Sequence, residues 1–223
     1  MEKVFKFSNK SIVFSVILVL VSLIISVSIG AAEISTDEIV GIFLREILGY
    51  QSNTEINNIN KIIILEWRLP RFCLGFLVGA SLAIAGCGFQ GVFKNPLADP
   101  FLLGSAAGAG LGVTLVIVND LNYSFGIINS VQLGAFIGAL GAVICAAFIS
   151  ISAGKSIASL LLAGIATAAF LTACQTYLMH KYYSSMQEIY SWIIGRLLTS
   201  GWEDVITILP YFTVCFICLL YTS

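Results

Sequence analysis

Long runs of apolar residues are the feature that most limits how this chain can fold. Residues 11–32 contain no charged side chain, and about 20 apolar residues are enough for a helix to cross the ~30 Å hydrocarbon core of a bilayer. Of all residues, 58% are hydrophobic and only 10% are charged, whereas charged residues make up about 25% of a typical soluble domain. Because lipid offers the backbone no hydrogen-bond partners, each run is expected to be helical. The sequence therefore predicts an all-α, polytopic transmembrane helical bundle.

Polar segments divide the apolar residues into six predicted spans. They cover residues 11–32, 62–93, 101–118, 127–150, 157–179 and 205–221. The first is longer than the ~7–15 apolar residues of a secretory signal peptide, and no A-x-A site follows it, so we expect it to be retained. Lys3, Lys6 and Lys10 precede it, and since basic flanks stay inside, the N-terminus is expected in the cytosol. A count of all basic residues, five inside and six outside in this layout, does not decide the orientation.

Two segments between the spans are expected to form short helices. Residues 37–48 place Ile39 and Phe43 on one face, and Thr36 before Asp37 favours a helix start there. We interpret this segment as a surface helix on the external side. Residues 189–195, within the external segment 180–204, predict a short and partly buried helix.

Glycines four residues apart favour close helix packing. In lipid, small residues let two helix backbones approach, because packing rather than hydrophobicity drives association there. Gly104, Gly108 and Gly112 have this spacing, and it recurs in the pairs Gly75/Gly79 and Gly134/Gly138. A nucleotide-binding loop is the weaker interpretation, since Val113 stands where the third glycine of G-x-G-x-x-G belongs.

The sequence carries no pattern that indicates an enzyme or a cofactor site. Gly154-Lys155-Ser156 resembles the end of a Walker A loop, but Ile149 replaces the earlier glycine that such a loop requires. His180 is the only histidine, which excludes a multi-His metal site, and the six cysteines fall in apolar segments, where they act as small hydrophobes. No pair of acids and no Ser/Lys or Ser/His couple lies within the spans. A net charge of −1 without a long basic run gives no reason to expect nucleic acid as a partner.

Residues 68–112 carry the most specific signal. Arg68 and Arg71 bracket Pro70 at the start of an apolar run, which ends at the turn 95–100 before a glycine-dense segment. The residues concerned are Arg68, Pro70, Arg71, Gly86, Gln90, Asn95, Pro96, Leu97, Ala98, Pro100 and Gly104. Together they resemble the permease subunit of FecCD-type ABC importers, which take up iron-siderophores, haem or cobalamin.

The resemblance implies a single transmembrane permease domain over residues 1–223 and a set of partners. Family members have about ten spans of roughly 20 residues each, so six would be the N-terminal part. Truncation is expected because the sixth span ends without a basic flank. The implied partners are a second permease subunit, identical or closely related, separate cytosolic ATPase subunits and an extracytoplasmic substrate-binding protein, in a prokaryotic inner or plasma membrane. A bundle with only an assembly role and, less favoured, an intramembrane enzyme are the alternatives.

The resemblance also implies roles for individual residues. Arg68 and Arg71 would face outward and dock the binding protein, with interfacial snorkelling as the alternative. Asn95 and Leu97, with Gly154, would lie at the cytosolic mouth, although Asn before Pro is also a common turn starter. Polar residues within spans are candidates for the pathway, although hydroxyls often bond to their own helix backbone instead. These candidates are Gln90, Thr167, Thr172 and Gln175.

Overall fold

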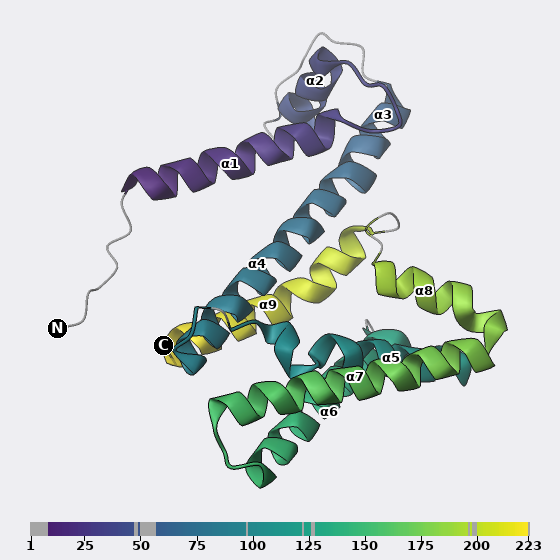
Figure 1. Cartoon of the computed structure of the whole chain (residues 1–223). Helices are drawn as coiled ribbons and strands as arrows, with labels where there is room; N and C mark the ends of the chain where they lie inside the picture. The colour runs from purple at the N-terminus through teal and green to yellow at the C-terminus, as the bar shows by residue number, and fades with distance from the viewer. Residues whose placement is uncertain are drawn as a thin grey trace. The chain divides into compact units, whose positions relative to one another are not determined.

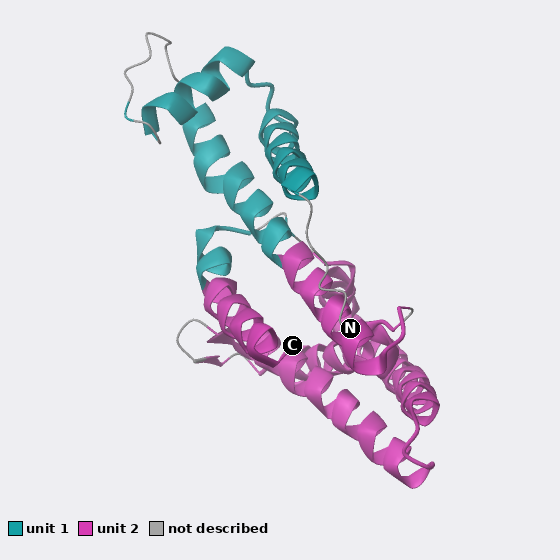
Figure 2. Cartoon of the chain, turned by 90° about the vertical axis from the view of Figure 1, so that its left-hand side faces the viewer, with its two compact units in different colours: residues 1–77, 197–206 teal, residues 78–196, 207–223 magenta. Residues whose placement is uncertain are grey.

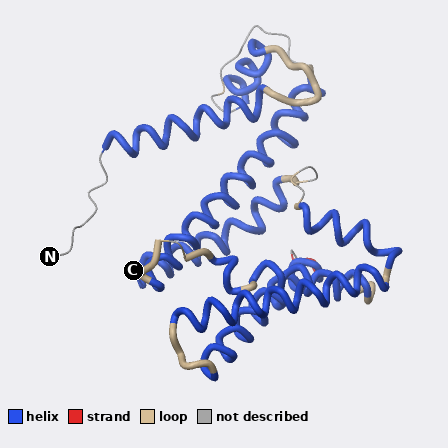
Figure 3. Tube along the Cα trace, viewed as in Figure 1, coloured by secondary structure: helices blue, strands red, loops and turns tan. Residues whose placement is uncertain are grey.

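The computed structural model describes residues 9–46, 49, 57–96, 98–121, 123–125, 128–195, 197 and 200–222. These residues are almost entirely helical (Figure 1, Figure 3). The strands β1 (Ser124–Phe125) and β2 (Ile128–Asn129) form a two-residue antiparallel ladder. The predicted all-α fold is confirmed.

Within the described residues, five helices are long and apolar enough to cross a membrane. They are α1 (Asn9–Ser28), the continuous helix Asn58–Phe93, α6 (Ser130–Ser152), α7 (Ile157–Lys181) and α9 (Trp202–Thr222). The continuous helix joins α3 (Asn58–Ile62), the π-helix η1 (Ile63–Arg68) and α4 (Leu69–Phe93). The chain is a multi-pass membrane protein.

The remaining predicted span, residues 101–118, differs from the prediction. It begins with a 3₁₀ helix, η2 (Pro100–Leu103), and continues as α5 (Ser105–Val118) only after Gly104, whose φ is 79°. The Asp99 side chain accepts a hydrogen bond from the Phe101 amide and Pro100 occupies the first turn, which starts the separate 3₁₀ helix. At 14 residues, α5 is about 21 Å long at 1.5 Å per residue, which is shorter than the hydrocarbon core.

The chain forms two compact units (Figure 2). Unit 1 contains residues 1–77 and 197–206, and unit 2 contains residues 78–196 and 207–223. Both α4 and α9 run from one unit into the other, because the boundaries at 77/78 and 206/207 fall inside these helices. A single domain over residues 1–223 stays a prediction.

Unit 1 has its core at the end of α1. Val27, Ile42 and Ile64 are almost completely buried there, together with Ile34 and Ile39. Helix α2 (Thr36–Glu46) supplies Ile39 and Ile42, which confirms the amphipathic helix predicted at residues 37–48 as far as Glu46, since residues 47 and 48 lie outside the described residues.

Unit 2 is built on α5, α6 and α7, where helix backbones approach closely. A Cβ atom at Gly108 would overlap the carbonyl oxygen of Gly138, and one at Gly112 would overlap that of Gly134. A Cβ atom at Gly164 of α7 would likewise overlap the Leu102 carbonyl. The close packing predicted from glycine spacing is therefore found between α5 and α6.

Two other glycines with that spacing have no such neighbour among the described residues. A Cβ atom at Gly75 would meet only Leu197 Cδ1, at 3.8 Å, and one at Gly79 would meet nothing within 4 Å. By contrast, the short helix predicted around residue 189 is found. It is α8 (Met186–Ile194), preceded by the 3₁₀ helix η3 (Tyr183–Ser185), and its Ile189 is fully buried.

The α5–α6 contact can be tested with two glycines of one helix. Gly138→Ala places a methyl group against the backbone of Gly108, which cannot move aside cheaply, so we expect a loss of about 1–3 kcal/mol in stability. A Cβ atom at Gly141, also on α6, would meet nothing within 4 Å among the described residues, and Gly141→Ala should be neutral or stabilise by up to about 1 kcal/mol. Thermal unfolding of the purified protein in detergent measures both. Equal unfolding midpoints for the two variants would contradict the close contact.

Candidate functional site

The start of α4 is shaped by Pro70. Directly after η1, the amide of Leu69 donates a hydrogen bond to the Ile64 carbonyl, five residues back, and not to that of Leu65. The next donor that could reach Leu65 in the same pattern is residue 70, but proline has no N–H. The indole Nε1–H of Trp202 donates to the Leu65 carbonyl instead, at 2.9 Å. This partner was not predicted, although the missing donor at Pro70 is visible in the sequence.

Arg68, the last residue of η1, lies buried, with 7% of its surface exposed. Its Nη1 donates to the Val27 carbonyl at 2.5 Å and, at 3.4 Å, to that of Ser28, while Nη2 donates to the Ala32 carbonyl at 2.6 Å. The Arg68 head group therefore binds the end of α1, and its docking role stays a prediction.

Arg71, one turn further along α4, is only half-buried. Residues three apart on a helix lie on neighbouring parts of one face, so the two arginines share one side of the continuous helix Asn58–Phe93, where Arg68 is the more buried of the two. The docking role of Arg71 stays a prediction.

The turn after α4 has the hydrogen bonds of a Schellman motif. Lys94 adopts the left-handed conformation with a φ of 48°. The Asn95 amide donates to the Gln90 carbonyl at 3.2 Å, and the Lys94 amide donates to that of Gly91 at 3.3 Å. The Asn95 carbonyl then accepts from the Ala98 amide at 3.1 Å. Asn95 thus takes part in the turn through its backbone, while Leu97 lies outside the described residues.

Gly154 ends α6 in the same way. Its φ is 104°, in the region that favours glycine, and the Lys155 amide donates to the Ser150 carbonyl at 3.1 Å. Ser156 then begins α7 with a capping box, in which its side chain and that of Ser159 accept each other's backbone amides. The string Gly154-Lys155-Ser156 is therefore one helix end followed by one helix start.

The predicted pathway residues fall into two groups. Thr167 and Gln175 are buried in unit 2, at 5% and 8% exposed. The Gln175 amide fills the space beside Gly110, where a Cβ atom would lie 2.8 Å from Oε1. Thr167 Oγ1 and Gln175 Nε2 have no hydrogen-bond partner among the described residues. Gln90 on α4 and Thr172 on α7 are exposed.

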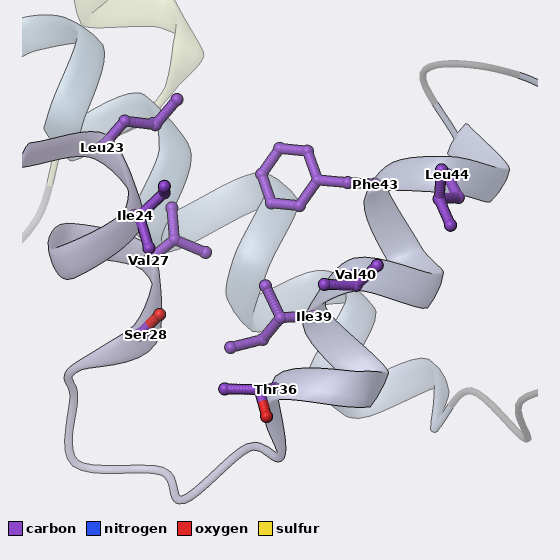
Figure 4. Close-up of a pocket in the computed structure, with 9 residues that line it drawn as sticks. All are labelled: Leu23, Ile24, Val27, Ser28, Thr36, Ile39, Val40, Phe43 and Leu44. Carbon is purple, nitrogen blue, oxygen red and sulfur yellow. The ribbon is translucent and has the colours of Figure 1, made fainter. Parts of the chain in front are cut away.

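An apolar pocket of about 480 Å³ lies in unit 1 between the last turns of α1 and the helix α2 (Figure 4). Side chains of α2, among them Ile39 and Phe43, point toward Leu23 and Val27 of α1. None of the predicted docking, mouth or pathway residues lines this pocket.

Comparison with known proteins places these features in a family. Residues 18–223 match the profile of the FecCD transport family. The chain belongs to this family. The profile describes a family of transport proteins. The resemblance stated from residues 68–112 is confirmed.

Relatives of this FecCD protein are named for the transport of different compounds. The Fe(3+)-citrate import system permease protein YfmE of Bacillus subtilis is 36% identical over 213 residues, 94% of this chain and 59% of that protein. The molybdate import system permease protein MolB of Haemophilus influenzae is 31% identical over 222 residues, 97% of this chain and 63% of that protein.

A solved structure has the same fold. It is described as an inward-facing conformation of a metal-chelate type ABC transporter, with a TM-score of 0.73 and 25% identity. The match covers 96% of this chain and 63% of that one. This chain thus spans about three fifths of the length of each of these three proteins.

The bond between Trp202 and Leu65 predicts a coupling between Trp202 and Pro70. Trp202→Phe removes the indole donor and leaves a carbonyl unpaired, which costs about 1–3 kcal/mol. Pro70→Ala restores an N–H that can reach Leu65, so Trp202→Phe should cost less in that background. Thermal unfolding of the two single variants and the double variant measures the coupling. Trp67→Phe, at a residue 57% exposed, is the control, and strictly additive losses would contradict the assigned partner.

Proposed function

We propose that this chain is a membrane-spanning part of an ABC importer permease that carries a metal chelate, such as an iron-siderophore, haem or a corrinoid, into the cytosol. The family match over residues 18–223 carries the proposal. The similarity to a metal-chelate type transporter and to an iron-citrate permease supports the cargo class. A molybdate relative of similar coverage makes molybdate the principal competing cargo.

The proposed transporter needs partners that supply energy and substrate. We propose that a second permease subunit, identical or closely related, completes the pathway, that cytosolic ATPase subunits drive it, and that an extracytoplasmic binding protein delivers the cargo. Basic residues before α1 support a cytosolic N-terminus. The start of α4, with Arg71, would then face the binding protein.

Two regions of the chain are proposed to contact the cargo route. The turn at Asn95 and Leu97, together with the turn at Gly154, would lie at the cytosolic mouth. The exposure of Gln90 and Thr172 suits residues that line a polar route. The burial of Thr167 and Gln175 suits a supporting role behind it, since polar groups inside a membrane protein commonly mark such regions.

Uptake by the assembled transporter tests the cargo. We expect ATP-dependent accumulation of a radiolabelled ferric chelate, hemin or cobalamin in proteoliposomes that contain the permease, its ATPase and its binding protein. Molybdate is the matched comparison, and omission of the binding protein is the control. Accumulation of molybdate alone would contradict the cargo class, and no ATP-dependent uptake of any compound would contradict the importer.

Accessibility of residue 97 tests the mouth. In the assembled transporter, Leu97→Cys should react with a thiol reagent applied from the cytosolic side, at a rate that changes between ATP-bound and nucleotide-free states, because a gate alternates its exposure. Lys10→Cys, expected on the same side, should react equally in both states and controls for sidedness. A nucleotide-independent rate at residue 97 would leave that segment with a turn role only.

A further inference from the structure

The apolar pocket between α1 and α2 has the size and the lining of a ligand site (Figure 4). Its volume of about 480 Å³ falls within the ~300–1,000 Å³ that is typical of small-molecule pockets. Ile24 of α1 and Val40 and Phe43 of α2 are among the apolar side chains in its wall. Among the described residues that line it, only Ser28 and Thr36 are polar. Such a lining suits an apolar chain and offers little to a polar compound.

The two polar residues lie at one end of the pocket. Ser28 is the last residue of α1 and Thr36 the first of α2, and the loop 29–35 joins them there (Figure 4). This loop borders a second, open hollow of about 530 Å³. Ser28 lines both the pocket and the hollow, and the hollow adds the side chains of Glu33 and Ser35. An apolar cavity and a more polar one therefore adjoin at Ser28.

Helix α1 sets the level of both cavities in a bilayer. Its 20 residues make it about 30 Å long at 1.5 Å per residue, which equals the ~30 Å hydrocarbon core. The end at Ser28 therefore lies where hydrocarbon gives way to water, with the pocket on the apolar side and the hollow beyond it. Ile24 and Val40 are more than half exposed, so the pocket opens toward lipid. The order of the two cavities is that of a phospholipid, in which acyl chains join a polar headgroup.

Charges of both signs lie at the hollow. The Glu33 side chain lines it and is exposed, and it makes no ion pair with any residue that the structure describes. Gly30 also lines the hollow, and a Cβ atom there would lie 2.5 Å from Nη2 of Arg68. The guanidinium is thus directly behind this part of the wall. A zwitterionic headgroup can place its ammonium at Glu33 and its phosphate on the side of Arg68, whereas an anionic headgroup would be repelled by the Glu33 carboxylate.

We infer that the gap between α1 and α2 is a phospholipid-binding site that selects an ethanolamine headgroup. One acyl chain occupies the apolar pocket, where burial of each methylene group favours binding. The primary ammonium donates hydrogen bonds to the Glu33 carboxylate. A choline headgroup has no N–H to donate, and a glycerol headgroup leaves the phosphate charge uncompensated beside Glu33. This site is independent of the proposed cargo and partners, since it requires only that α1 lies in a bilayer.

Photo-crosslinking measures occupancy of the pocket. The full-length transporter, purified in detergent, is mixed with a phosphatidylethanolamine that carries a diazirine on one acyl chain, and labelled peptides are identified by mass spectrometry. We expect labels on residues 23–28 and 39–44. Unlabelled phosphatidylethanolamine should displace the probe roughly three- to fivefold better than phosphatidylglycerol or phosphatidylcholine with the same acyl chains, which is the size of an exposed ion pair. Equal displacement by the three lipids would overturn the headgroup selection.

Two pairs of variants separate the headgroup from the acyl chain. Glu33→Gln should remove the preference for ethanolamine, while Asp37→Asn, at an acid that lines neither cavity, should keep it. Val40→Trp should fill the pocket and lower labelling by the probe roughly fivefold or more, because the acyl chain loses its space. Leu20→Trp, at an exposed position of α1 outside the pocket, should leave labelling unchanged.

The Glu33 variant decides the matter even where Val40→Trp fails to fold, because Glu33 lies in an exposed loop. A preference for ethanolamine that persists in Glu33→Gln would contradict the assignment of this carboxylate. Labels found only outside residues 23–28 and 39–44 would show that protein covers the pocket, either another segment or a second copy of the chain, and would overturn the site.

Discussion

The C-terminal end of every helix leaves carbonyl groups without intrahelical partners, and lipid cannot supply donors for them. At several helix ends in this chain, a residue in the left-handed conformation follows the last turn and lets a later amide bond to one of these carbonyls. Lys94, Asp120 and Gly154 have positive φ angles at the ends of α4, α5 and α6. In each case the amide of the following residue reaches back to a carbonyl of the last turn, at 3.1 or 3.2 Å. Helix α1 is different. Its last carbonyls accept hydrogen bonds from the side chain of Arg68, which lies about 40 residues later in the sequence.

The contact between α5 and α6 depends on a second constraint, the distance between two backbones. Gly108 and Gly112 face Gly138 and Gly134 so closely that none of the four positions has room for a side chain on that face. Such contacts gain dispersion energy along the helices rather than from water release, which lipid does not provide. Close packing of helix backbones therefore stabilises unit 2, whereas unit 1 has a core of aliphatic side chains around Ile42 and Ile64.

Much of the fold could be predicted from the sequence, because composition and periodicity decide it. The long helices, the amphipathic α2 and the turn at Asn95 follow from apolar runs, spacing and proline chemistry. The break at Gly104 could not, since residues 101–118 have the same composition whether or not a 3₁₀ turn interrupts them. The burial of Gln175 could not be predicted either, because α7 is apolar on most sides and periodicity does not show which side contacts α5. Arg68 points inward for a reason located 40 residues earlier, at the end of α1.

The partners of Arg68 also decide how its attachment responds to the medium. A backbone carbonyl carries no ionisable group, so this contact is not an ion pair between two side chains. Burial also shields it from salt, which screens exposed pairs more strongly. The pair between Lys61 and Glu46, at 2.6 Å and partly exposed on both sides, belongs to the opposite kind. The end of α1 is thus held by a contact that a change in salt concentration would leave largely in place.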